Sequence, residues 1–541
     1  KTARFMKRYV TQFVCGALFF SLTGMQQVRA QEKEGVEPMQ TGEYEPTWAS
    51  LARYECPDWF RDAKFGIWAH WGPQCEPESG DWYARNMYYP GEWQYDVHVK
   101  KYGNPKDFGF KDVIHEWKAE EWEPDSLIRF YKSVGARYFM TLGNHHDNFD
   151  LWDSKYQPWN SVNMGPKRDV VGEWAAACKK YGLPLGVSIH ASHTWTWMEG
   201  AQDFDGKLTK ADGKGKWWEG YDPQDLYEQR HERSKDSKNV GTIHSQWAWG
   251  NGASQPSEAF KTNVYNRTLD VVNRYHPDVL YFDDTVLPFY PISDEGVRIL
   301  AHMYNKSLKD HKGKMRAVVT GKILEDKHKE AMVWDVERGI PDRPQEKAWQ
   351  TCTCLGSWHY DRGIYDRGHY KPAATVVKML VDIVSKNGNL LLSVPLRGSG
   401  AIDEKEVAIL KDLKAWMDVN GESIYGTRPW TTFGEGPLAE AANPMKAQGF
   451  NEGQNYTAKD VRFVQKGKKV VYATALGWPE SKVIMMKSFR KGSPYYKGKV
   501  KSVELLGYGK VKFTCGEDGL KVMLPEEKTN DIAPVLKIKL V

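Results

Sequence analysis

Short apolar runs that end in polar or ionisable residues recur from about residue 60 to about residue 425. Longer segments of mixed character separate these runs. This alternation predicts strands separated by helices. It favours a (β/α)8-like barrel, regular or irregular, in which the carboxyl ends of the strands meet at one mouth. The predicted strands are residues 64–70, 137–143, 184–190, 279–282, 317–320 and 390–394.

Helical segments fit between the predicted strands. Residues 124–134, 169–181 and 263–275 are predicted helices, because each is closed by Gly or by His-Pro. The stretch 196–240 is charged and Gly-rich and has no clear period. It predicts either a lid over the barrel mouth or a surface excursion, with partial mobility.

The pattern changes after residue 428. Apolar and polar residues now alternate at period two between turn residues, which predicts antiparallel strands in a β-sandwich. These predicted strands are residues 461–464, 469–476, 482–486, 500–506 and 535–540. The sequence therefore predicts a catalytic barrel over residues 31–428 and a C-terminal sandwich over 429–541.

The first thirty residues contain five Lys or Arg residues, no Asp or Glu, and a short apolar run. This is typical of a cleaved signal peptide, so we expect an exported protein, periplasmic or secreted. No later apolar segment is long enough to predict a membrane span. Without these residues the formal charge of +5 falls to about zero. Nothing in this balance favours nucleic acid as a partner.

The seven cysteines have irregular spacing. Cys15 lies in the predicted signal peptide, and Cys352 and Cys354 lie in an apparent strand without partners at zinc-site spacing. We interpret the cysteines of the folded part as buried free thiols, with one disulfide as the alternative.

Three predicted strands carry carboxylates or imidazoles at their carboxyl ends. The run PDVLYFDD leads directly into Asp283 and Asp284, and another strand delivers His70. His145 and His146 follow a third strand. Carboxylates at the end of a buried strand tend to be functional because their desolvation is costly, although they also cap turns.

A series of motifs runs along the predicted barrel: WFRDAKFGIWAHWG, GDWY, NHHDNFDLWDSKYQPWNSV, GPKRDVVGEW, PDVLYFDD and VDIVSKNGNLLLSVP with NGESIYGTRPW. In these motifs and in their order the chain resembles the α-L-fucosidases of glycoside hydrolase family 29. The resemblance implies a retaining exo-glycosidase without a cofactor, which releases terminal α-L-fucose from an oligosaccharide or glycoconjugate through a covalent glycosyl-aspartate.

The resemblance also implies site residues. The family's nucleophile matches Asp283, and its sugar-binding imidazoles match His70, His145 and His146. The acid and the tryptophan of its EWY triplet match Asp81 and Trp82. Lys322 stands where many members have Arg, and Asp81 is one methylene shorter than the usual Glu. Because these exchanges alter hydroxyl recognition, a close relative of L-fucose stays an alternative substrate.

The second carboxyl group is not assigned by the resemblance. We predict Glu337 as the acid/base, because it follows a short apolar run near the eighth strand; Glu325, Glu330 and Glu346 are the competitors. His190 is a further predicted contact of the sugar or of its surroundings, and His193 is a less favoured one. Trp358 and His359 are both predicted to line the side of the leaving group.

Two other functions compete with this interpretation. His145, His146, Asp147, His190 and Asp283 offer donors for a metal-dependent barrel hydrolase, but the acids lack ligand-like spacing, so we predict no metal. A catalytically inactive sugar-binding protein is the other alternative, since a fold does not prove turnover.

Overall fold

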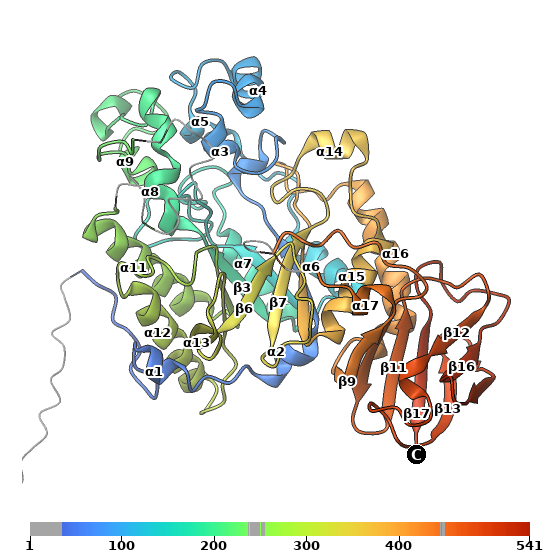
Figure 1. Ribbon diagram of the computed structural model, residues 1–541. Coiled ribbons are helices and arrows are strands. Elements are labelled where there is room, and N and C mark those ends of the chain that lie inside the picture. Colours follow the sequence, from blue (N-terminus) through green and yellow to red (C-terminus); the bar gives the residue numbers. More distant parts are fainter. Residues whose placement is uncertain (1–34, 236, 238–248, 250–254, 444, 446–448) are drawn as a thin grey trace, which may run out of the picture. The chain divides into compact units, whose positions relative to one another are not determined.

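The structure is a computed structural model that describes residues 35–235, 237, 249, 255–443, 445 and 449–541. The predicted signal peptide lies outside these residues. Eight parallel strands close into a barrel in chain order, with β1 paired to both β2 and β8 (Figure 1). The predicted barrel is confirmed. Its strands are β1 Phe65–Ala69, β2 Tyr138–Leu142, β3 Leu185–Ile189, β4 Val279–Phe282, β5 Val318–Gly321, β6 Val333–Glu337, β7 Trp349–Cys354 and β8 Gly388–Ser393.

Strand β6 was not among the predicted strands, and this corrects the position of Glu337. Glu337 is the last residue of β6 and does not lie near the eighth strand. The apolar pattern fails here because the barrel interior is polar at this point. Gln350 of β7 donates to Asp335 of β6 at 2.8 Å, and the Cys352 thiol lies 3.0 Å from the same carboxylate.

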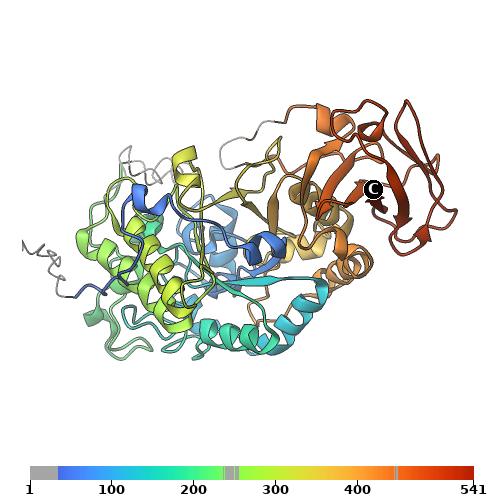
Figure 2. The same cartoon turned by 90° about the horizontal axis from the view of Figure 1, so that it is seen from below.

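Helices surround the barrel strands (Figure 1, Figure 2). Local signals set their ends: Asp169 caps α7 by accepting from the Gly172 amide at 2.9 Å, and Gly135 in the left-handed region ends α6. The third predicted helix begins five residues earlier than expected, where Ser257 caps the Phe260 amide. The longer helices are α4 Trp93–Tyr102, α6 Pro124–Val134, α7 Val170–Tyr181, α11 Glu258–Tyr275, α12 Glu295–Asp310, α15 Ala373–Ser385 and α16 Glu404–Asn420.

The stretch 196–240 forms short helical turns in its described part, including the end of α8 (Thr194–Trp197) and α9 (Gln224–Tyr227). Trp218 and Tyr227 are buried, and Asp205 forms a buried ion pair of 2.8 Å with Lys111. These contacts pack the described part against the rest of the domain, and both alternatives for this stretch, the lid and the surface excursion, stay predictions. Residues 236 and 238–240 lie outside them.

The C-terminal strands form two antiparallel sheets, which confirms the predicted sandwich class. The six-stranded sheet has the order β14-β13-β17-β11-β10-β9 and the three-stranded sheet the order β12-β16-β15. All five predicted strands occur; β9, β14, β15 and β16 were missed. The strands are β9 Arg428–Glu435, β10 Val461–Lys466, β11 Val470–Ala475, β12 Val483–Met486, β13 Val500–Leu505, β14 Gly509–Lys510, β15 Phe513–Cys515, β16 Leu520–Met523 and β17 Val535–Leu540.

The sheets pack beside α15 of the barrel (Figure 1), where a buried ion pair joins Asp382 of α15 to Arg462 of β10. We keep residue 428 as the proposed border of the two domains. All six cysteines of the described residues are free; four are buried, whereas Cys515 is exposed and Cys56 half-buried.

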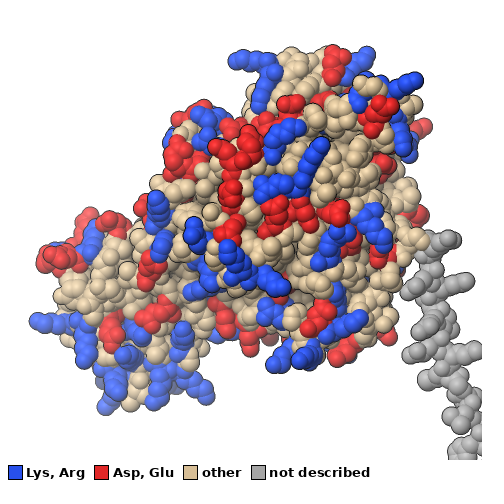
Figure 3. Space-filling view, turned by 180° about the vertical axis from the view of Figure 1, so that it is seen from behind, with Lys and Arg blue, Asp and Glu red and all other residues tan. Residues whose placement is uncertain are grey.

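The surface of the described residues carries both charges. On the face drawn in Figure 3, Lys and Arg are interspersed with Asp and Glu over most of the molecule. Within the part of the chain that the structure describes, no helix combines the length and apolar character that crossing a bilayer requires.

Candidate active site

A cavity of about 740 Å³ opens at the carboxyl ends of the barrel strands. Nine of the ten predicted site residues line it, and the exception is His146. The nine are His70, Asp81, Trp82, His145, His190, Asp283, Lys322, Glu337 and Trp358.

Strand geometry explains why these side chains converge. Side chains two residues apart on a strand point to the same face of the sheet. A side chain that points into the barrel near the end of a strand therefore predicts that the side chain two positions later also points inward. Trp68 of β1 precedes His70 in this way, and Tyr281 of β4 precedes Asp283. All four residues line the cavity.

The two predicted catalytic carboxylates share one ammonium group. Lys322, just after β5, forms an ion pair with Asp283 Oδ1 and another of 2.8 Å with Glu337 Oε2. The paired oxygens therefore lie no more than two hydrogen-bond lengths apart, about 6 Å. Retaining glycosidases separate their carboxyl groups by about 5–5.5 Å and inverting ones by about 6.5–9.5 Å. The arrangement suits retention.

Asp283 is held in the ionised form. Burial alone would raise its pKa, but the Lys322 charge and hydrogen bonds from His146 and His190 hold the pKa well below its usual range. His146 Nε2 lies 3.2 Å and His190 Nδ1 3.3 Å from Asp283 Oδ2. Burial also lowers the pKa of Lys322, but Asp283 and Glu337 raise it well above its ordinary value. The site thus presents a charged carboxylate beside a fixed cation.

His146 lies behind Asp283 and does not line the cavity. Its Nδ1–H donates to the His190 carbonyl at 2.7 Å, which orients the ring toward the carboxylate. His146 thus contacts Asp283 in the structure, and the direct sugar contact that the resemblance implies stays a prediction.

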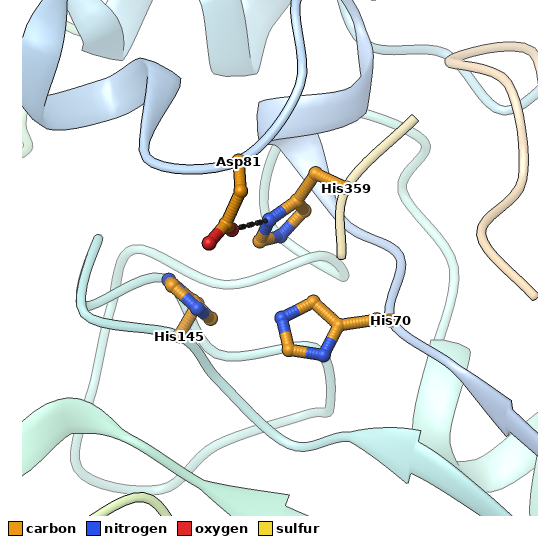
Figure 4. Close-up of side chains that lie close together, drawn as sticks. All are labelled: His70, Asp81, His145 and His359. Carbon is orange, nitrogen blue, oxygen red and sulfur yellow. Dashed lines mark hydrogen bonds and ion pairs between the residues drawn. The ribbon is translucent and has the colours of Figure 1, made fainter. Parts of the chain in front are cut away.

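Imidazoles gather on one wall of the cavity. The rings of His70 and His145 lie 5.2 Å apart, and His359 approaches both, at 4.6 and 4.7 Å (Figure 4). Burial, followed by the neighbouring imidazoles, lowers the pKa of His70 and of His145 well below the usual value. Neutral imidazoles both donate and accept hydrogen bonds, so this wall can read sugar hydroxyls.

Asp81 extends toward the same imidazoles, and its Oδ1 accepts from His359 Nδ1 at 2.7 Å (Figure 4). Both ring nitrogens of His70 are buried without a hydrogen-bond partner among the described residues. Such nitrogens are costly unless a ligand satisfies them. Trp358, with its ring 5.6 Å from that of His70, adds a flat apolar surface.

Two candidates that stand close to site residues in the sequence, Asp284 and His193, lie outside the cavity. Asp284 is buried away from the cavity, accepts from the Ser192 hydroxyl at 2.7 Å and pairs with His193 Nε2 at 2.7 Å. His193 stacks on Trp249 with ring centroids 4.8 Å apart. Asp284 therefore has a structural role, although it bonds two side chains, whereas the turn cap that we considered would use backbone amides.

The three other glutamates considered as the acid/base lie in positions that suit this role less well than that of Glu337. Glu325 lines the cavity, but its side chain is 68% exposed and pairs with Lys327. Glu330 pairs with Lys347 at the surface, and Glu346 lies before the amino end of β7, opposite the mouth. Glu337 alone among the four contacts Lys322 in the described structure.

Several contributors to the site were not predicted from the sequence. Gln74 lies 2.9 Å from His145 Nδ1 and 3.2 Å from Asp147, and so orients that ring. Trp68 lines the cavity, and its spacing of two from His70 was the available signal. Phe450 also lines the cavity, although it comes from beyond the barrel sequence and carries no recognisable motif.

Among the residues that the structure describes, two groups of side chains could also hold a cation. One is the cluster of Figure 4, namely His70, Asp81, His145 and His359, and the other consists of His145, His146 and His190. In each group the donor atoms all lie within 4.8 Å of one another. This proximity leaves the metal alternative open to experiment.

The family model described as Alpha-L-fucosidase matches residues 32–422, and the model described as Alpha-L-fucosidase C-terminal domain matches residues 454–539. The chain belongs to the α-L-fucosidase family. The first of these matches spans the whole barrel, and the second spans most of the C-terminal sheets.

Individual fucosidases are similar over most of the chain. The α-L-fucosidase of Branchiostoma floridae is 27% identical over 497 residues, 90% of this chain and 93% of the relative. The tissue α-L-fucosidase of Rattus norvegicus is 27% identical over 468 residues, which cover 82% of this chain and 81% of the relative.

Solved structures share the fold. A Thermotoga maritima α-L-fucosynthase has a TM-score of 0.69 at 24% identity, covering 92% of this chain and 100% of the other. A Bacteroides thetaiotaomicron α-L-fucosidase of family 29, solved as a trapped covalent intermediate, has a TM-score of 0.58 at 17% identity, covering 93% and 100%.

Proposed function

We propose that this protein is a retaining α-L-fucosidase that removes terminal α-L-fucose from glycans, with Asp283 as nucleophile and Glu337 as acid/base. Family membership supports the activity. The roles of Asp283 and Glu337 are supported by one observation: the Lys322 ammonium contacts both carboxylates inside the cavity.

The first step forms the covalent intermediate. Asp283 attacks the anomeric carbon while protonated Glu337 gives its proton to the glycosidic oxygen, so the bond to the leaving group breaks. Asp283 loses its negative charge into the ester as Glu337 gains one. Because Lys322 pairs with both groups, its charge compensates the carboxylate on either side of this step.

The second step regenerates the enzyme. Glu337, now ionised, takes a proton from water, and the water oxygen attacks the anomeric carbon and displaces Asp283. Water enters from the side that the leaving group has vacated, so the anomeric configuration is retained. His146 and His190 stabilise the returning carboxylate through their contacts with Oδ2.

We also propose that the protein acts outside the cytoplasm, exported to the periplasm or secreted. The charge and apolar pattern of residues 1–30 supports this location. Similar proteins are named tissue and plasma α-L-fucosidases.

A panel of 4-nitrophenyl glycosides tests the function. We expect the α-L-fucoside to be hydrolysed at least 100-fold faster than the β-D-galactoside, and EDTA to leave kcat unchanged, because the proposed steps use only carboxylates. Release of nitrophenolate with and without EDTA is the measurement. Loss of activity in EDTA and recovery with Zn²⁺ would support the metal-dependent alternative, and preference for an α-L-galactoside would indicate the related sugar.

His359→Ala tests the imidazole wall. His359 is a positioning residue in this proposal, because it holds Asp81 and touches the rings of His70 and His145. We expect KM for the fucoside to rise about tenfold, with a smaller change in kcat. A tenfold rise corresponds to the loss of one hydrogen bond that contributes ~1.4 kcal/mol to binding. His359→Asn, which keeps an N–H near Nδ1, should recover most of the loss. Equal KM values in all three proteins would contradict the assignment.

A further inference from the structure

A segment from beyond the barrel returns to its mouth. Gly449 pairs with Glu337 in a parallel bridge, and the Phe450 amide donates to the Glu337 carbonyl at 3.1 Å. The Asn451 amide donates to the Arg338 carbonyl at 3.0 Å. The backbone that carries the proposed acid/base is therefore covered by residues 449–451, which follow β9 in the chain.

Glycines permit this close approach. Gly449 has φ +109°, and a Cβ there would lie 2.5 Å from the Glu337 carbonyl oxygen. A Cβ on Gly339 would lie 2.6 Å from the Gly449 Cα. Larger residues at either position would push the two backbones apart.

Side chains anchor the segment on its far side. Asn451 accepts from the Ile340 amide at 2.8 Å and donates to its carbonyl at 3.0 Å. Glu452 accepts from Arg338 at 2.9 Å and pairs with Lys371 at 3.2 Å. The backbone contacts of Gly449 and the side-chain contacts of Asn451 and Glu452 hold the segment on both sides of Phe450. The Phe450 side chain therefore has a defined place at the cavity.

Two large apolar side chains stand exposed in this cavity. Phe450 is 50% and Ile323 48% exposed, and both line it. Ile323 has φ +54°, an outlier for a β-branched residue that costs on the order of 1–3 kcal/mol. Residues held in such conformations cluster at ligand sites, where the surrounding structure maintains them.

Both residues are next in sequence to a residue that contacts Glu337. Phe450 follows the residue that bridges Glu337, and Ile323 follows Lys322, which contacts Glu337. Since the acid protonates the glycosidic oxygen, the leaving group departs on the side of Glu337. An apolar surface there meets the part of the substrate beyond the fucose.

We propose that Phe450 and Ile323 form a leaving-group subsite that binds the apolar face of the pyranose to which fucose is attached. This inference rests on the proposed function and adds a preference for glycans over simple fucosides. A flat aromatic ring and a branched aliphatic chain match the C–H face of a sugar ring, whose hydroxyls stay at the open rim.

Three substrates test the subsite: a fucosyl-hexose disaccharide, methyl α-L-fucoside and α-L-fucosyl fluoride. The disaccharide needs both the subsite and the acid, the methyl fucoside needs the acid alone, and the fluoride reports on the nucleophile. In Phe450→Ala we expect the ratio of kcat/KM for the disaccharide to that for the methyl fucoside to fall about tenfold. Ile323→Ala should lower the same ratio.

Tyr508→Ala is the matched control, because Tyr508 is an exposed aromatic residue (58%) in the turn between β13 and β14, outside the cavity. Its ratio should equal that of the wild type, and thermal melts confirm that each variant folds. An unchanged ratio in Phe450→Ala overturns the subsite. So does an equal loss on disaccharide and methyl fucoside with the fluoride spared, since Phe450 would then act only through Glu337. If the wild type cleaves none of the three, the proposed function fails instead.

Discussion

Asp283→Ala is expected to lower kcat on an aryl α-L-fucoside by about four orders of magnitude, ~5.5 kcal/mol of transition-state stabilisation, because the variant loses the covalent route. Initial rates at saturating substrate measure the loss. Azide should restore part of the activity by entering the space left by the carboxylate, and the product should be the β-L-fucosyl azide, because the attack comes from the nucleophile's side.

Asp284→Asn is the control for this prediction. Asp284 is adjacent in sequence but bonds Ser192 and His193 away from the cavity. Its replacement should lower the melting temperature while kcat stays within about tenfold, since only a buried polar contact changes. In the wild type, a 2-fluoro fucosyl donor should leave an adduct on Asp283 that peptide mass spectrometry locates. An adduct on another carboxylate would remove Asp283 from its proposed role.

Glu337→Ala is expected to lower kcat/KM about 10³-fold on substrates with a poor leaving group, because general acid catalysis is lost. Aryl fucosides with acidic phenols should lose much less in the first step, since their oxygen needs no proton. Azide should accelerate the second step and give the α-L-fucosyl azide, the anomer opposite to that from Asp283→Ala. The configuration of the azide, read by NMR, distinguishes the two roles.

Glu330→Ala provides the comparison for Glu337. Glu330 pairs with Lys347 outside the cavity, so its variant should keep wild-type rates and show no azide product. Azide rescue in Glu325→Ala with none in Glu337→Ala would move the acid/base to Glu325, which also lines the cavity.

Lys322 connects these two predictions. One cation serves two carboxylates, so removing either partner changes the charge balance of the other. The effects of Asp283 and Glu337 variants should therefore not be additive. A guanidinium in place of Lys322 would contact both groups with a fork of donors, whereas the ammonium acts as a point charge.

The local sequence determined most of the barrel and the nucleophile strand. Runs such as VLYF are apolar throughout and end in carboxylates, so their burial and their direction can be inferred without coordinates. Caps such as Asp169 and stops such as Gly135 act within a few residues, which is why two of the predicted helices begin within one residue of their observed starts. The motif series placed the chain in its family because the motifs occur in order.

Tertiary structure alone decided the rest. The polar interior hid strand β6 in the sequence, because Asp335 and Gln350 satisfy each other only after the strands have paired. Burial and charge alone do not distinguish Asp283 from Asp284 in the sequence; the motif match favoured Asp283, and in the structure Asp283 contacts Lys322 whereas Asp284 contacts His193. Phe450 reaches the cavity through backbone contacts with Glu337, more than a hundred residues away. Contacts between distant segments depend on the closed barrel, and no local pattern encodes them.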